Sequence, residues 1–352
     1  MMVKVPVSII INNYNYSQFL GEAIDSALSQ TYPNTEVIVV DDGSTDNSQD
    51  IITNYGTQIV PLLKNNGGQA SALNAGFEVS RGEIVIFLDA DDYLFPYAVE
   101  RVIAAWEPSV ANVQYRLELV DAQKKFIDTL PRPEIHLDSG DVLPILLKKG
   151  RYNCLVTSGN AFSRAALAEI VPIPEDEFRI SADGYLVTLI PFYGQIVSIE
   201  EPLGGYRQHG SNLWSTREGV ASEKFIKSIK HDFLKYKVLR DKATELGYEV
   251  PQNLGLCDYF HLQDRLSSLR LAPQNHPVPL DSQLILAYKG FLAVWKDSDF
   301  SRKRKLILST WFLWVGVMPQ ALAKPAITWW LASESRPKAI DLLLKKIRSL
   351  TT

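Results

Sequence analysis

Residues 84–92 read Ile-Val-Ile-Phe-Leu-Asp-Ala-Asp-Asp, a run of five apolar residues followed at once by carboxylates. A short, fully apolar run of this kind predicts a buried strand. Residues two apart on an extended backbone face the same side, so Asp89 and Asp91 are predicted to point into one site. Asp92 extends the cluster. A solvated acidic turn before a helix is the alternative interpretation, because Asp is common at helix starts.

Two more apolar runs upstream end in polar residues in the same way. Val7–Ile11 leads into Asn12-Asn13-Tyr14-Asn15, and Glu36–Val40 leads into Asp41-Asp42-Gly43-Ser44. Helical spacing of apolar residues separates these runs, which predicts an α/β fold with a mostly parallel, twisted sheet and flanking helices. Ligands bind at the carboxyl ends of the strands in such a sheet, so the three polar segments are predicted to converge on one rim.

The chemistry of this rim follows from its residue types. Carboxylates packed together repel one another unless a cation lies among them, and hard oxygen ligands suit Mg²⁺ or Mn²⁺. Asp42 is a candidate acceptor for an N–H group of a nucleotide base, and Tyr14 for stacking on that base. A strand–turn–helix junction built from good turn residues is the alternative interpretation of residues 41–44.

Over residues 6–96 the chain resembles the N-terminal half of family 2 glycosyltransferases, an inverting group with the GT-A fold. The order and spacing of several short motifs carry this resemblance. They are Val7–Ile11 with Tyr14-Asn15, Ser29–Pro33, Val39–Asp46, Asn66–Gln69, Asn74–Gly76, Arg81–Glu83 and Leu88–Asp92.

The resemblance implies a role for each matching residue. Asn12, Tyr14 and Asp42 are implied to hold the base, and Gly68 and Gln69 to border the base and ribose. Asp89 and Asp91 are implied to form the metal-binding DxD pair, with Asp92 sharing in donor binding. The donor implied is a UDP-sugar. Many relatives carry Pro-Thr where this chain has Asn12-Asn13, a departure that alters the base pocket.

A weaker resemblance continues beyond residue 150. Ile180–Leu186 lies where relatives often carry Glu-Asp before a helix, which makes Asp183 the implied general base, while Ala182 replaces the Glu. Tyr206–Asn212 matches the end of the catalytic domain, where Arg207 and His209 are candidates for contacts with the donor diphosphate or the metal. A helix N-cap is the alternative interpretation of Asp183, and a packed turn residue that of His209.

Composition limits the class of protein. With 46% hydrophobic and 22% charged residues over 352 positions, the chain is globular, and its two cysteines suit a reducing cytoplasm. The start of the chain does not have the pattern of a secretory signal. From Lys296 to the end, eleven Lys or Arg face four Asp or Glu, a net +7 that leaves −11 for the rest. An acidic body of this kind argues against nucleic acid as a partner.

Two domains are expected. Residues 1–215 are predicted to form the catalytic domain, with nucleotide-sugar binding in 1–110 and the acceptor side in 111–215. Residues 216–352 are predicted to be helical. Five of the seven tryptophans lie between 295 and 330, near the basic run 302–305, and residues 338–350 form a basic amphipathic segment. This pattern favours a helix on a membrane surface, peripheral to the inner face of the plasma membrane. A bundle packed on the catalytic domain or on a second copy is the alternative.

The expected activity is transfer of a sugar to a glycan or lipid-linked acceptor hydroxyl, in polysaccharide or glycolipid synthesis. A nucleotidyltransferase also uses carboxylates and Mg²⁺, but it is expected to carry a basic glycine-rich loop where this chain has Asn12–Asn15. Neither a P-loop nor a G-x-G-x-x-G motif is present. A non-catalytic carbohydrate-binding or scaffold protein on a transferase fold is favoured only by Ala182 and by Leu73, which stands where many relatives carry Arg.

Overall fold

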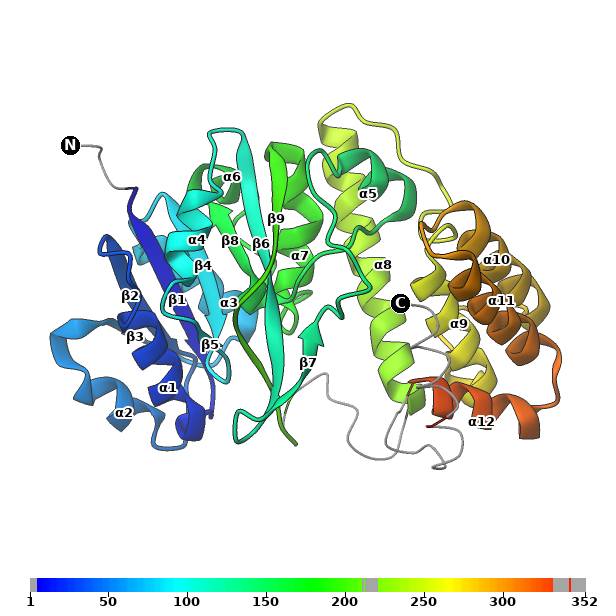
Figure 1. Ribbon diagram of the computed structural model, residues 1–352, viewed down its shortest axis with the longest axis horizontal. Helices are drawn as coiled ribbons and strands as arrows, with labels where there is room; N and C mark the ends of the chain where they lie inside the picture. Colours follow the sequence, from blue (N-terminus) through cyan, green and yellow to red (C-terminus); the bar gives the residue numbers. More distant parts are fainter. Residues whose placement is uncertain (1–4, 211, 213–220, 332–341, 343–352) are drawn as a thin grey trace. The chain divides into compact units, whose positions relative to one another are not determined.

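The computed structural model describes residues 5–210, 212, 221–331 and 342 (Figure 1). The chain divides into two compact units. The first contains residues 1–144 and 152–209, and the second contains residues 145–151 and 210–352. The predicted α/β fold class is confirmed. A sheet of parallel and antiparallel strands with flanking helices is followed by a helical C-terminal region.

One sheet of nine described strands runs through the first unit, in the order β3-β2-β1-β4-β8-β6-β9-β5, with β7 paired to β6. The strands are β1 (Val7–Asn13), β2 (Thr35–Asp41), β3 (Val60–Leu63), β4 (Ile84–Asp89), β5 (Tyr93–Leu94), β6 (Val110–Asp121), β7 (Phe126–Leu130), β8 (Asn160–Ser163) and β9 (Gln195–Gln208). The first four strands of this order pair with one another in parallel. Antiparallel pairings enter with β8, which joins β4 to β6.

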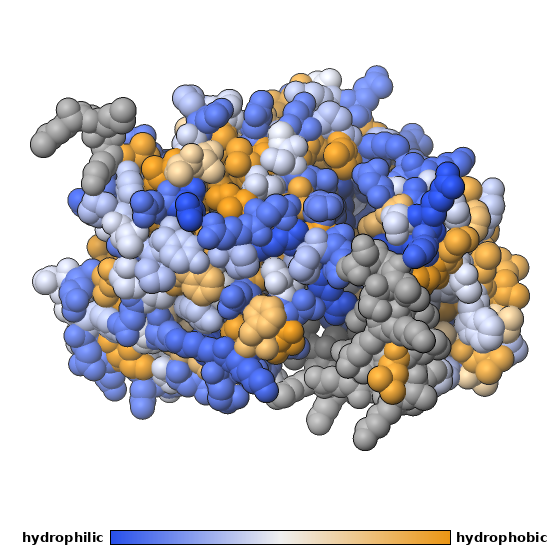
Figure 2. All heavy atoms as spheres, in the orientation of Figure 1, coloured by the Kyte–Doolittle hydropathy of each residue, from blue (hydrophilic) through white to orange (hydrophobic). Residues whose placement is uncertain are grey.

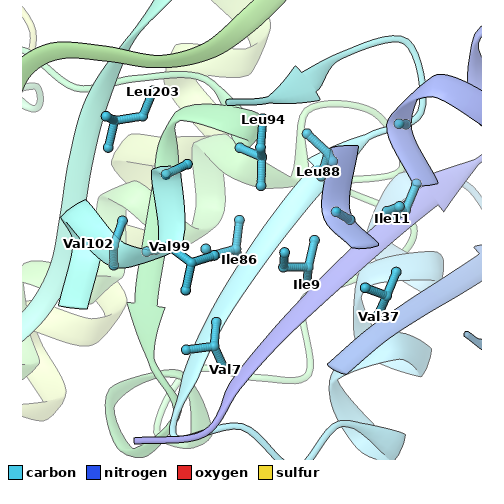
Figure 3. Close-up of a cluster of buried hydrophobic side chains, with 14 of the residues drawn as sticks. Val7, Ile9, Ile11, Val37, Ile86, Leu88, Leu94, Val99, Val102 and Leu203 are labelled. Carbon is cyan, nitrogen blue, oxygen red and sulfur yellow. The ribbon is translucent and has the colours of Figure 1, made fainter. Parts of the chain in front are cut away.

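Helices cover both faces of the parallel strands. The helices of this unit are α1 (Ser17–Leu28), α2 (Ser48–Asn54), α3 (Gln69–Val79), α4 (Ala98–Ala104), α6 (Arg164–Ala168) and α7 (Ala182–Leu189). Alternate strand residues face opposite sides. Val7, Ile9 and Ile11 pack with buried residues of α1 and α4 in the cluster that Figure 3 shows. On the other face, a Cβ at Gly76 of α3 would lie 2.3 Å from Ile10 Cγ2, so that helix packs directly on the sheet.

The middle of the chain is more regular than its sequence suggests. The sequence of residues 112–215 has little regular pattern and is rich in Pro and Gly, and the strand it predicts there is the run Gln195–Ile199. The structure instead has the long strands β6 and β9, which pair in parallel. β9 continues through Pro202 because the register shifts there, between the pairs Tyr115–Ile199 and Arg116–Pro202. Such an irregularity tolerates a proline that lacks a backbone donor.

The second unit is helical. It contains α8 (Ala221–Glu245), α9 (Tyr259–Leu271), α10 (Gln283–Lys296), α11 (Arg302–Val317) and α12 (Gln320–Leu331). Its core gathers fully buried side chains such as Leu262, Val294 and Phe312. Helix α5 (Leu143–Lys149) spans the point where the chain passes from one unit to the other. The predicted basic segment 338–350 falls, apart from Leu342, outside the described residues. Among the described helices, none is long and apolar enough to cross a bilayer.

Candidate active site

Three strand ends meet at one rim, as the sequence predicts. In the register of the parallel strands, Asn13 of β1 lies opposite Asp41 of β2, and Asn12 lies opposite Asp89 of β4. Side-chain hydrogen bonds link the same pairs. Asn13 Nδ2 donates to Asp41 Oδ1 at 2.8 Å, and Asn12 Nδ2 donates to Asp89 Oδ1 at 3.0 Å. The asparagines therefore hold the carboxylates of the neighbouring strands in place.

The carboxylates after β4 differ in their surroundings. Asp89 is partly exposed, Asp91 is 8% exposed and Asp92 is only 1% exposed. Asp92 accepts hydrogen bonds from Ser158 Oγ at 2.6 Å and from the backbone N–H of Arg207 at 2.9 Å. Its carboxylate therefore joins the β4 rim to the end of β9.

Crowding of negative charge shifts the acidity of this cluster. Burial, and then repulsion from Asp91 and Asp183, raises the pKa of Asp89 to about 7. Hydrogen bonds from Asn12 and Gln69 lower this pKa and offset part of the rise. Burial and repulsion from Asp91 and Asp89 raise the pKa of Asp92 well above its ordinary value. Asp183 is thus among the charges that act on Asp89.

His209 and Arg207 both lie at this cluster. His209 is 6% exposed, and its Nε2 is 3.0 Å from Asp91 Oδ2. Arg207 is 2% exposed, and its Nε donates to the backbone carbonyl of Asp91 at 2.8 Å while its guanidinium also pairs with Glu22. These contacts hold the segment after β4 against the end of β9. A contact between Arg207 and a diphosphate stays a prediction.

The residues present fit a divalent cation, provided that a ligand completes its shell. Within the described ranges, no three His, Cys, Asp or Glu side chains are grouped closely enough to hold a metal ion alone. Two ligands about 2.1 Å from a cation and at right angles to each other lie about 3.0 Å apart. The pair Asp91 Oδ2 and His209 Nε2 has this spacing; here the two atoms are joined by a hydrogen bond, which a cation between them would replace. Mg²⁺ usually uses one or two carboxylates with water and substrate phosphates, so the pair and nearby Asp89 suit a cation held jointly with a diphosphate.

Asp42 holds a loop together rather than lying open. It is 2% exposed, its Oδ1 accepts from Lys64 Nζ at 2.7 Å and Gly67 N at 2.9 Å, and its Oδ2 accepts from Gly68 N at 2.7 Å. Oδ2 keeps room for one further donor, as a base N–H contact requires. Tyr14, by contrast, is 47% exposed, as a stacking surface needs to be. The roles of both residues in binding a base stay predictions.

Asp183 lies in the first turn of α7, directly after the N-cap residue Ser181 and Ala182. Gln69 reaches this point from the start of α3. Its Oε1 accepts from the backbone N–H groups of Ser181 and Ala182, and its Nε2 donates to Asp89 Oδ1. The structure thus brings together Asn12, Gln69, Asp89, Asp91, Asp92, Asp183 and His209, and the Gly68 amide connects Asp42 to the same set.

The sequence did not predict several side chains that complete the site. Burial raises the pKa of Tyr16, and the charges of Asp91, Asp89 and Asp92 raise it further. Burial also raises the pKa of Tyr206, and Asp92 is the largest of the charges that add to this shift. Both phenols therefore lie at the cluster. Lys64 and Ser158 were also missed. No local pattern marks these four residues, although Tyr16 and Tyr206 lie within a few residues of predicted site residues.

The fold defines a class of protein before any sequence match is considered. A solved structure of S. aureus TarS 1–349, in complex with UDP-GlcNAc, superposes with a TM-score of 0.55 over 92% of this chain and 91% of that chain, at 16% identity. At this identity the likeness concerns the fold alone, which is that of GT-A glycosyltransferases.

The sequence identifies the family. The profile of glycosyl transferase family 2 matches residues 8–170. An uncharacterized glycosyltransferase of Nostoc sp. (strain PCC 7120) is 38% identical over 248 residues, which cover 69% of this chain and 77% of that protein. The chain therefore belongs to glycosyl transferase family 2. The E. coli UDP-Glc:alpha-D-GlcNAc-diphosphoundecaprenol beta-1,3-glucosyltransferase WfaP is 44% identical over 89 residues, 25% of this chain and 36% of that protein.

Proposed function

We propose that this glycosyltransferase moves a sugar from a UDP-sugar to an acceptor hydroxyl with inversion at the anomeric carbon. One observation carries the proposal: Asp89, Asp91, His209 and the start of α7 with Asp183 share one rim of the sheet. The names of the E. coli relative and of the S. aureus complex, which specify UDP-Glc and UDP-GlcNAc, support UDP as the nucleotide. In this proposal residues 1–110 bind the donor and residues 111–215 form the acceptor side.

Each residue has a role in the proposed reaction. Asp91 and His209, with Asp89 beside them, would hold Mg²⁺ or Mn²⁺, which supplies Lewis-acid stabilisation to the departing diphosphate. Asp183 accepts the proton of the acceptor hydroxyl as that oxygen bonds to the anomeric carbon and the bond from this carbon to the diphosphate breaks. One displacement of this kind inverts the centre. Asp92 and Arg207 hold the segment after β4 against the end of β9.

A panel of nucleotide-sugars tests the proposed function. With Mn²⁺ present, we expect the full chain to bind at least one UDP-sugar and to release UDP from it, and we expect EDTA to abolish the release. NMR of the glycosyl product reports whether the anomeric configuration is inverted. Failure to bind any nucleotide-sugar of the panel would contradict the proposal. Binding without release would instead favour a carbohydrate-binding protein on a transferase fold.

We also propose that the second unit contacts an anionic membrane surface, where a lipid-linked acceptor would be met. Apolar side chains are exposed on α10 and α11, among them Tyr288 at 61% and Val317 at 60%. Figure 2 shows hydrophobic residues gathered over these helices at the right of the view. Neither α10, α11 nor α12 contains an Asp or Glu, while α11 begins with four basic residues, 302–305. Positive charge beside exposed apolar and aromatic side chains suits anionic lipid.

Sedimentation with vesicles tests the membrane contact. We expect the chain to pellet with vesicles containing anionic lipid and much less with neutral ones. The double variant Arg302→Glu/Lys303→Glu should weaken binding at least about 30-fold, because each basic residue contributes about 1 kcal/mol near such a surface. Lys230→Glu/Lys237→Glu on α8 carries the same charge change as a control. Equal pelleting of both variants, or self-association of the chain that hides this face without vesicles, would contradict the contact.

A further inference from the structure

The side-chain amide of Gln69 joins three separate segments of the first unit. Its Nε2 donates to Asp89 Oδ1 at 3.0 Å and to Thr157 Oγ1 at 3.3 Å. Its Oε1 accepts from the backbone N–H groups of Ser181 and Ala182 at 3.0 and 3.1 Å. One side chain on α3 therefore ties the end of β4 to the start of α7.

The partners of Gln69 fix the orientation of its amide. Backbone N–H groups can only donate, so the oxygen of the amide must face Ser181 and Ala182. The NH₂ group then faces the Asp89 carboxylate, which can accept. A flipped amide would set donors against donors on one side and oxygen against oxygen on the other. The partners of Gln69 therefore allow only one orientation of its side-chain amide.

The start of α7 needs an acceptor from outside the helix. The first N–H groups of any helix have no partner within it. Ser181, the N-cap residue, makes no side-chain cap hydrogen bond and has a φ of 68°, in the left-handed region that is unfavourable for residues with a Cβ. Gln69 Oε1 supplies the acceptor. Asp183 follows in the same turn, so this contact fixes the backbone from which its side chain extends.

The backbone beside Gln69 reinforces the link. Gln69 N donates to the carbonyl of Arg179 at 2.8 Å. At Gly68, where φ is +91°, a Cβ would lie 2.4 Å from Arg179 Cγ and 2.7 Å from Arg179 O. The Arg179 guanidinium also donates to the carbonyl of Gly67 at 2.9 Å. The loop before α3 and the segment before α7 therefore pack against each other without room for an added atom.

We propose that Gln69 is a positioning residue for sugar transfer, which sets the Asp183 carboxylate relative to Asp89. The proposal rests on the roles proposed above for these two carboxylates. The N–H of Ala182 is held by Gln69, so the start of α7 is fixed from α3.

Hydrogen exchange tests the bridge without any substrate. In the full chain, Gln69→Ala should raise the exchange rates of the Ser181 and Ala182 amides at least 10-fold and leave β1 unchanged. Gln69→Glu keeps an acceptor for these amides but sets a carboxylate oxygen against Asp89, so it should raise the exchange rates less than Gln69→Ala does. Gln58→Ala, at an exposed position, is the control. Unchanged exchange at both amides in Gln69→Ala would overturn the proposal. If Gln69→Ala fails to fold, unprotected exchange of both amides in the unaltered chain would do so.

Kinetics of UDP release from the UDP-sugar that the panel identifies, with Mn²⁺, separate positioning from donor binding. Gln69→Ala should lower kcat about 10- to 100-fold, because small misplacement of a reacting group has effects of this size, with the donor KM changed less than about 3-fold. Added to Asp183→Asn, it should lower kcat by less than about 3-fold more, because the group that it positions is gone. A raised KM at unchanged kcat, or losses that multiply, would overturn the proposal. If Asp183→Asn itself changes nothing, the proposed function fails, and the exchange result still decides whether the bridge exists.

Discussion

Asp183→Asn is expected to lower the rate of sugar transfer by about 10²- to 10⁴-fold, the usual contribution of a general base. The substitution keeps the size and shape of the side chain but removes the group that accepts the proton of the acceptor hydroxyl. Asp183 lies in the first turn of α7 and within electrostatic reach of Asp89. Initial rates at saturating UDP-sugar measure the loss, and calorimetry with UDP and Mn²⁺ should show a dissociation constant changed less than about 3-fold.

The control for this variant is Asp176→Asn, the same substitution at an exposed position seven residues earlier. It should transfer sugar at the unaltered rate. Transfer at the unaltered rate in Asp183→Asn would remove Asp183 from the mechanism. A large loss of UDP affinity in that variant would instead assign Asp183 to donor binding.

Asp91→Ala is expected to weaken Mn²⁺-dependent binding of UDP by about 100-fold or more. Loss of a side chain that only supports a metal ligand lowers affinity about 10- to 100-fold, and a direct ligand should reach at least the upper end of this range. His209→Ala should produce a loss in the same direction, because its Nε2 and Asp91 Oδ2 form the 3.0 Å pair that fits a cation. Titration of Mn²⁺ in the presence of UDP, followed by calorimetry or by the Mn²⁺ paramagnetic signal, measures both.

Asp50→Ala on α2 is the matched control, because Asp50 is exposed and is not part of the rim. Its titration should coincide with that of the unaltered chain. Equal Mn²⁺ affinity in Asp91→Ala, His209→Ala and Asp50→Ala would show that the cation, if it binds, uses other residues. Loss in Asp91→Ala without any loss in His209→Ala would limit the ligand role to the carboxylate.

The parallel half of the sheet could be predicted because each strand there is an apolar run that ends in polar residues. Asn12, Asp41 and Asp89 meet at one rim for this reason. Strand β6 was missed although Val113, Tyr115, Leu117 and Leu119 alternate with polar residues, which is the signal for a strand with two different faces. Asn112, Gln114 and Arg116 are nevertheless buried, which alternation in the sequence does not predict.

The pairings within the site could not be predicted from local pattern. Asp92 accepts a hydrogen bond from Ser158, 66 residues further on, and Asp42 forms a salt bridge with Lys64. The motif around Asp42 predicts an acceptor for a base N–H, but it does not reveal that the carboxylate is also buried and hydrogen-bonded to its own loop. Residue type and spacing indicate which groups gather at the rim. Only the tertiary fold determines which of them are already engaged by protein partners.

The contacts between the segment after β4 and the end of β9 bear on the stage of folding at which the chain becomes active. Three contacts bring residues 115, 116 and 118 positions apart together: Asp92 with the Arg207 amide, Asp91 with the Arg207 guanidinium, and Asp91 with His209. Contacts between such distant segments form late, because closing a long stretch of chain costs entropy. If the proposed roles of these residues hold, we expect that a nascent chain that has not yet emerged from the ribosome as far as His209 does not catalyse transfer, even with its first four strands already assembled.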